Sequence, residues 1–239
     1  MGWQFRRNVL TVVTVATLGV LSACGPKSTP PPPPPPPPAP PPVVYIPPRP
    51  LPPLGAAASL VVPPVGVDGT RRTVNTGITP AQTLWNFRSA YNVAALNCMK
   101  PEHADILVGY KKFLVTHKKA LTTANKTVDS EFRKRHGTAF VRPREAYMTQ
   151  VYNFYAFPPT VARFCDAALI MARESMTVKP ADLQPFSVRS LAMLDGVFET
   201  FYKSYDQYRA DAAAWDAKYA PAATAPVAPV SGPTPTPGT

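Results

Sequence analysis

The chain has 239 residues, of which 45% are hydrophobic and 33 are proline. Twenty prolines lie between positions 26 and 64 and six follow Tyr219, so the compositional breaks leave one candidate domain of roughly 140–150 residues, with room for a single hydrophobic core. The formal net charge of +11 favours association with anionic partners and says nothing about the fold.

The first 23 residues have the order of features of a secretory signal. Two arginines precede an apolar run from Val9 to Leu21, which is too short to serve comfortably as a permanent membrane span. The next residues complete the sequence Leu21-Ser22-Ala23-Cys24, which resembles the lipobox of bacterial lipoproteins. The resemblance implies cleavage before Cys24, lipid attachment to its thiol and a durable membrane anchor. An uncleaved anchor and a plain secretory signal are the alternatives.

The same resemblance bears on location. In enterobacterial lipoproteins an Asp after the lipidated cysteine favours retention in the inner membrane, whereas this chain has Gly25. We therefore expect a lipid-anchored protein of the cell envelope that faces the periplasm, at the outer membrane rather than the inner one.

Export leaves Cys98 and Cys165 as a pair in an oxidising compartment. Cys98 continues an apolar stripe of helical spacing that includes Tyr91, and Cys165 lies on a second such stripe with Ala168. We predict that the two form a disulfide, which would stabilise the fold by roughly 3–5 kcal/mol. Two buried free thiols are the alternative.

Residues 24–78 are predicted to form a lipid-anchored, proline-rich linker. Pro30 to Pro38 is an unbroken run that favours polyproline II, and residues 30–53 would reach about 75 Å as a semi-rigid spacer. A passive tether without further function is the alternative. Residues 220–239 carry no charge and are predicted to be a disordered tail.

Residues 79–219 show helical periodicity almost throughout, and Thr79, Pro80 and Gln82 match a capping box with proline at the first helical position. We predict an all-α domain, an antiparallel bundle of four to five helices. The helices are expected near 80–98, 101–136, 144–156, 159–176 and 181–219. The heptad over 191–215 packs within the chain or forms an intermolecular seam, so the oligomeric state stays open.

The expected helix over 101–136 carries a basic stripe, formed by Lys112, Lys119, Lys126 and Arg133 at every seventh position together with Arg135. On one straight helix the repeat would extend about 31 Å, on the side away from the apolar seam. The stripe is a candidate binding site for phosphate-bearing lipid or another anionic envelope component. An ordinary solvated helix face is the alternative.

The remaining candidate residues do not form a recognisable site. His103 and His117 are too far apart on one helix to share a metal, and His117 is expected to be a hydrogen-bonded histidine of the core. No catalytic motif is present, so we expect no cofactor, metal or catalytic residue. The aromatic residues at 147–157 line either the core or a ligand groove. Four glutamates lack distinguishing neighbours: Glu102, Glu131, Glu145 and Glu174.

These observations favour a non-enzymatic envelope lipoprotein that displays a binding or structural module on a proline stalk. Its expected partners are a membrane, through Cys24, and an anionic envelope component or envelope protein, whereas nucleic acid is not expected. A cell-wall hydrolase that uses a helical glutamate and an assembly subunit of an envelope complex are the two alternatives.

Overall fold

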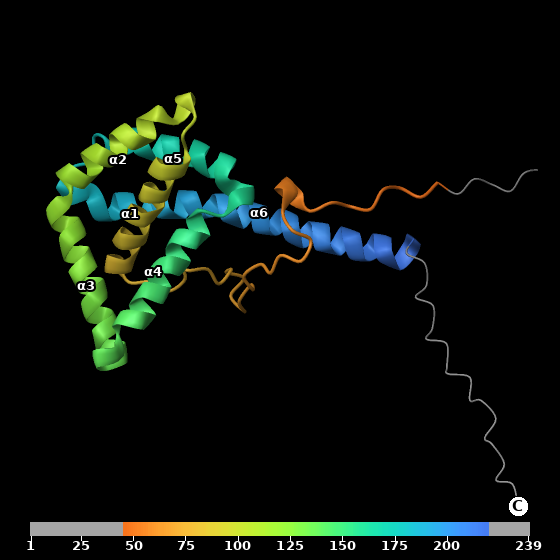
Figure 1. Ribbon diagram of the computed structural model, residues 1–239, viewed down its shortest axis with the longest axis horizontal. Helices are drawn as coiled ribbons and strands as arrows, with labels where there is room; N and C mark the ends of the chain where they lie inside the picture. Colours follow the sequence, from red (N-terminus) through yellow and green to blue (C-terminus); the bar gives the residue numbers. More distant parts are fainter. Residues whose placement is uncertain (1–44, 220–239) are drawn as a thin grey trace, which may run out of the picture. The chain divides into compact units, whose positions relative to one another are not determined.

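The computed structural model describes residues 45–219; Cys24, the predicted signal segment, the proline run and the tail after Tyr219 lie outside them. Within this range six α-helices pack together as a helical bundle and no strand is present, which confirms the all-α prediction (Figure 1). The helices are α1 (Pro80–Asn97), α2 (Ala104–Thr116), α3 (Lys118–His136), α4 (Val141–Tyr155), α5 (Val161–Ser175) and α6 (Leu183–Tyr219).

Helix α1 lies at the centre of the bundle. It contacts each of the other five helices, and 11 of its 18 residues are buried. In Figure 1 it lies across α6 and is surrounded by α2, α3 and α4. A helix buried on nearly every side needs apolar residues around its whole circumference rather than along one stripe, and α1 has them in Leu84, Phe87, Ala90 and Val93.

The start of α1 is fixed by the predicted capping box. The Thr79 hydroxyl accepts a hydrogen bond from the backbone N–H of Gln82 at 3.1 Å, and the Gln82 side-chain oxygen accepts one from the backbone N–H of Thr79 at 3.0 Å. Pro80 occupies the first helical position, where the missing N–H costs nothing.

The helix predicted over 101–136 is interrupted at His117. This residue has φ −108° and ψ 15°, which ends α2 at Thr116 and starts α3 at Lys118, so the bundle has six helices instead of four to five. A straight helix across this region would be about 50 Å long, so part of it would extend beyond the core. The break instead lets α2 pack against α5 while α3 packs against α1 and α4.

Helices α2 and α5 approach each other closely at Gly109. A Cβ atom at this position would lie 2.9 Å from the carbonyl oxygen of Ala172 and would also collide with the Tyr91 hydroxyl. Glycine is therefore required here by space rather than by backbone conformation.

Residues 46–78 fall within the expected linker, yet the structure places them in the same compact unit as the helices. Ala56 belongs to the core, and four partly buried side chains of this segment pack against it, namely Leu60, Val62, Val74 and Ile78. The segment also bonds to α6, because the Tyr205 hydroxyl donates to the carbonyl of Ala57 at 2.8 Å and the Trp215 indole to that of Pro47 at 2.8 Å. Prolines disfavour an α-helix in this segment but do not prevent apolar packing.

Cys98 and Cys165 form a disulfide, as predicted. Their Cα atoms lie 5.5 Å apart, and the bond joins positions separated by 67 residues. Cys98 follows the last residue of α1 and Cys165 lies in α5, and both are buried. The bond therefore ties the end of the central helix to a neighbouring helix.

We predict that the Cys98→Ala/Cys165→Ala double variant unfolds with a free energy lower by about 4 kcal/mol, because a closed loop of this length removes entropy from the unfolded chain. Urea denaturation of the full chain in a Cys24→Ser background measures the difference. The unaltered pair under reducing conditions is the control and should lose a similar amount, whereas a loss below about 1 kcal/mol in both would contradict the account.

Candidate functional site

The five residues of the basic stripe are all exposed, but they do not lie on one helix. Lys112 belongs to α2, whereas Lys119, Lys126, Arg133 and Arg135 belong to α3. The predicted straight track of about 31 Å is therefore wrong, because the break at His117 turns the helix between the first two lysines. The part from Lys119 to Arg133 remains in line along α3 over about 21 Å.

The basic stripe makes no ion pair with any described residue between 45 and 219. The two carboxylates of α3 are engaged elsewhere, since Asp129 pairs with Arg144 of α4 and Glu131 accepts a hydrogen bond from the Thr79 hydroxyl at 3.1 Å. The cations of α3 are thus left without neutralising neighbours among residues 45–219. An uncompensated row of charges attracts counter-ions or an anionic partner.

Two arginines of the stripe rest on aromatic rings. The Arg133 guanidinium carbon lies 4.7 Å from the ring centre of Phe140, and that of Arg135 lies 4.5 Å from the ring centre of Phe132. Such cation–π contacts leave the edge of the guanidinium free to bind an anion. The end of α3 therefore presents positioned rather than freely moving cations.

Apolar side chains lie exposed beside the lysines of α2. Val108 and Val115 are 58% and 79% exposed, and Leu107 is 41% exposed. A hollow of about 590 Å³ extends from Val115 to Lys126 and is bordered by Lys118 and Lys119. Exposed apolar groups next to basic groups are typical of surfaces that contact a membrane or a partner protein.

His117 is buried, as predicted, but it is not hydrogen-bonded. The side chain is 2% exposed, and neither ring nitrogen has a partner among the described residues. Burial lowers the pKa of His117, which favours a neutral ring. The ring of Phe113 packs against His117 with its centre 5.1 Å away.

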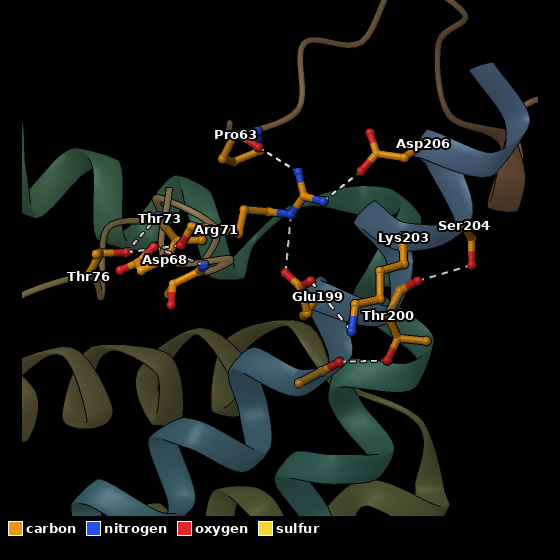
Figure 2. A network of polar contacts seen from close by, with 12 residues as sticks. Pro63, Asp68, Arg71, Thr73, Thr76, Glu199, Thr200, Lys203, Ser204 and Asp206 are labelled. Atoms are coloured by element: carbon orange, nitrogen blue, oxygen red, sulfur yellow. Dashed lines mark hydrogen bonds and ion pairs between the residues drawn. The ribbon is translucent and has the colours of Figure 1, made fainter. Parts of the chain in front are cut away.

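Arg71 holds the segment 46–78 against α6. Figure 2 shows its guanidinium between the carbonyl of Pro63 and two carboxylates of α6. The nitrogen–oxygen distances are 3.1 Å to Glu199 and 2.6 Å to Asp206, and the ring of Tyr202 packs 5.2 Å from the guanidinium carbon. Because the Arg71 side chain is only 4% exposed, both carboxylates are needed to offset the cost of burying its charge.

A second network connects Asn75 to three helices. The Asn75 amide donates to Asp195 of α6 at 2.8 Å, and its carbonyl oxygen accepts from Asn86 of α1 at 2.7 Å. The Tyr155 hydroxyl of α4 also donates to Asp195, at 3.1 Å, and the Tyr147 hydroxyl donates to Asn86 at 2.7 Å. Burial raises the pKa of Asp195 to about 7 despite these hydrogen bonds, which favour the charged form.

A cavity of about 500 Å³ borders this network and is lined in part by Arg71, Asn75 and Asp195. A carboxyl group with a raised pKa beside a cavity is a candidate proton donor or acceptor. Here, however, the carboxylate oxygens of Asp195 accept hydrogen bonds from Asn75 and Tyr155, which belong to the protein itself. The arrangement holds the fold together.

The other sequence candidates are not brought into one site. Of the four glutamates, Glu102 pairs with Lys100 and Glu174 with Arg189, and the set is spread over four elements. Between residues 45 and 219 no group of three or more histidines, cysteines or carboxylates is placed to hold a metal ion. In the aromatic cluster Tyr155 is fully buried and Phe154 stacks on Phe198 with ring centres 4.3 Å apart, so these rings form core.

Comparison with known proteins gives no further guidance, since no protein-family model, curated protein or solved structure matches this chain. None of the helices within 45–219 has the length and apolar character to cross a membrane.

The roles of Arg71 and Asn75 were missed at the sequence level because both lie in a segment that resembles a linker. Their carboxylate partners on α6 are more than 100 positions away, so local spacing carries no signal for these pairs.

We predict that Asp195→Asn removes a pH dependence of stability. The folded protein holds the Asp195 proton with a pKa of about 7 against 3.8 for the ordinary group, so the stability from this group is present below about pH 4 and lost as the pH rises through 7. From pH 5 to pH 8 the unaltered protein should therefore lose roughly 2–3 kcal/mol relative to the variant.

Urea denaturation of both proteins at the two pH values gives this difference. Other titrating groups, including His117 with its lowered pKa, are common to both proteins and cancel in the comparison. A stability difference that is the same at pH 5 and pH 8 would show that Asp195 is ionised throughout.

Proposed function

We propose that this protein is a lipid-anchored envelope protein that binds an anionic component of the envelope through the basic stripe, without catalysing a reaction. The observation that carries the proposal is the set of exposed cations on α3, with no neutralising partner among the described residues. The two acidic groups of the same helix contact other parts of the fold, because Asp129 pairs with Arg144 and Glu131 accepts a hydrogen bond from Thr79.

Binding to such a component would be mainly electrostatic, with an apolar contribution. Each basic residue close to an anionic lipid surface contributes about 1 kcal/mol to binding, and the attraction falls off within a Debye length of about 10 Å at moderate salt. Val108 and Val115 would add apolar contact where the lysines of α2 and the start of α3 meet such a surface. Binding should therefore weaken as salt is raised without vanishing.

The predicted lipid at Cys24 and the proline run complete the proposal. An anchor confines the domain near a membrane, which raises the local concentration of any envelope ligand, and a spacer sets the distance at which the domain acts. A weak electrostatic site is then sufficient for binding. The lipid anchor makes the first contact with the membrane, so the contact between the basic stripe and its ligand forms within an assembly that is already tethered.

The assembly-subunit alternative relied on the heptad over 191–215 as an intermolecular seam. The chain itself buries this seam, because Leu194, Phe198, Phe201 and Tyr205 are each at most 2% exposed. The residues that the structure leaves exposed on α2 and α3 offer a different surface, and the proposal rests on that surface alone.

We predict that the triple variant Lys119→Gln, Lys126→Gln and Arg133→Gln loses at least tenfold in partitioning to vesicles of phosphatidylglycerol and phosphatidylcholine, since three charges are each worth about 1 kcal/mol near the surface. The full chain in a Cys24→Ser background is used so that no lipid anchor dominates binding. Co-sedimentation at low and high salt measures the partition coefficient.

The matched control removes the same charge from three exposed residues outside α3, as Arg163→Gln, Lys179→Gln and Arg209→Gln. It should bind almost as well as the unaltered chain. Equal losses in both triple variants would show attraction by net charge alone, and no binding of the unaltered chain to anionic vesicles or lipopolysaccharide would end the proposal.

A further inference from the structure

A second hollow lies between α3 and the start of α1, and Lys119 of the basic stripe is one of its lining residues. It has a volume of about 590 Å³, within the range of small-molecule sites. Its walls come from one face of α3, from the first turns of α1 at Ala81 and Leu84, and from Gln184 at the start of α6. Three elements that are distant in sequence thus form one site.

The hollow is elongated along α3. Its lining residues on this helix and the break before it include His117, Ala120, Ala124 and Thr127, which recur at steps of three and four and therefore share one face. Between His117 and Thr127 this row extends about 15 Å. A row of this length along one helix offers contacts to an extended chain over about 15 Å.

One end of the hollow is polar. His117 is buried with both ring nitrogens unpartnered among the described residues, and Lys119, which lines the same hollow, makes no ion pair there. A neutral imidazole has one N–H donor and one acceptor, and buried polar atoms are normally paired. The end at His117 is therefore prepared for a polar group that accepts a hydrogen bond next to a positive charge.

The rest of the hollow is largely apolar. Its lining includes the apolar residues Ala81, Leu84, Ala120 and Ala124, together with three threonines. Small residues on α3 leave space that larger side chains would have filled, so the hollow results from the sequence at these positions. The polar end and the apolar remainder of the hollow match a ligand that has both a polar head and an apolar chain.

We infer that this hollow binds a single-chain amphiphile with an anionic head group, with the head at His117 and Lys119 and the chain along Ala120 and Ala124. The head is a carboxylate or a phosphate, which both accept hydrogen bonds from a ring N–H and attract an ammonium group. The inference does not depend on vesicle binding by the basic stripe, because the hollow is formed by other residues apart from Lys119.

The test uses the full chain in a Cys24→Ser background and three probes below their micelle concentrations: dodecanoate, dodecyl phosphate and uncharged dodecanol. Isothermal titration measures affinity, and NMR of labelled histidine rings locates the ligand. We expect saturable binding of at least one anionic probe, at least tenfold tighter than that of dodecanol, with a shift of the His117 ring signals. His103, whose ring is held by Asp166 at 3.0 Å, should not shift.

Two variants remove the site in different ways. His117→Phe keeps an aromatic ring and deletes the polar anchor, and Ala120→Phe fills the apolar part. Each should weaken the anionic probe at least tenfold while thermal unfolding shows that the protein still folds. Thr122→Phe places the same ring on α3 at an exposed position that does not line the hollow and should leave binding unchanged.

The outcomes separate the possibilities. A preference for dodecanoate or for dodecyl phosphate assigns the head group to a fatty acid or to a single-chain phospholipid. Dodecanol bound as tightly as both anions, binding that survives both site variants, or no binding below the micelle concentration would overturn the inference. If the unaltered chain bound the anionic probe but did not bind anionic vesicles, the result would count against the proposed function and leave this inference standing.

Discussion

Burial of α1 on almost all of its surface is the constraint on which the rest of the fold depends. The helix carries Asn86 and Ser89 into this interior, and each is fully buried. The Ser89 hydroxyl donates to the carbonyl of Trp85 at 2.9 Å, but Asn86 needs partners from outside the helix, which Asn75 and Tyr147 supply. A buried amide left without them would cost about 1–3 kcal/mol, so the central helix also fixes the segment before it.

Helix α3, in contrast to α1, has few buried residues. Only three of its 19 residues are buried, namely Ala124, Val128 and Phe132. Because so little of the helix is used for packing, its cations remain free on the outside and small residues such as Ala120 leave a hollow on the inside. The surface proposed to bind an anionic component and the cavity proposed to bind an amphiphile both follow from the small number of buried residues on α3.

The sequence predicts those features that depend on neighbouring residues. The capping box at Thr79, the helical spacing and the apolar stripes that carry Cys98 and Cys165 are local patterns of this kind, and all were found in the structure. The break at His117 was not predictable, because the apolar spacing runs through it from Leu114 to Leu121 without a proline or glycine. That bend is decided by tertiary packing, because α2 and α3 pack on different helices. The pairing of Arg71 and Asn75 with distant carboxylates also depends on tertiary structure.

Hydrogen exchange on the full chain, with and without anionic vesicles, tests most directly whether α3 is the functional element. Without vesicles, amides of α1 should exchange only through global unfolding, whereas those of the first half of α3 should exchange through local opening. Added anionic vesicles should slow exchange in α3 and leave α5 and α6 unchanged. Unchanged exchange in α3, or protection confined to α5 and α6, would contradict the account.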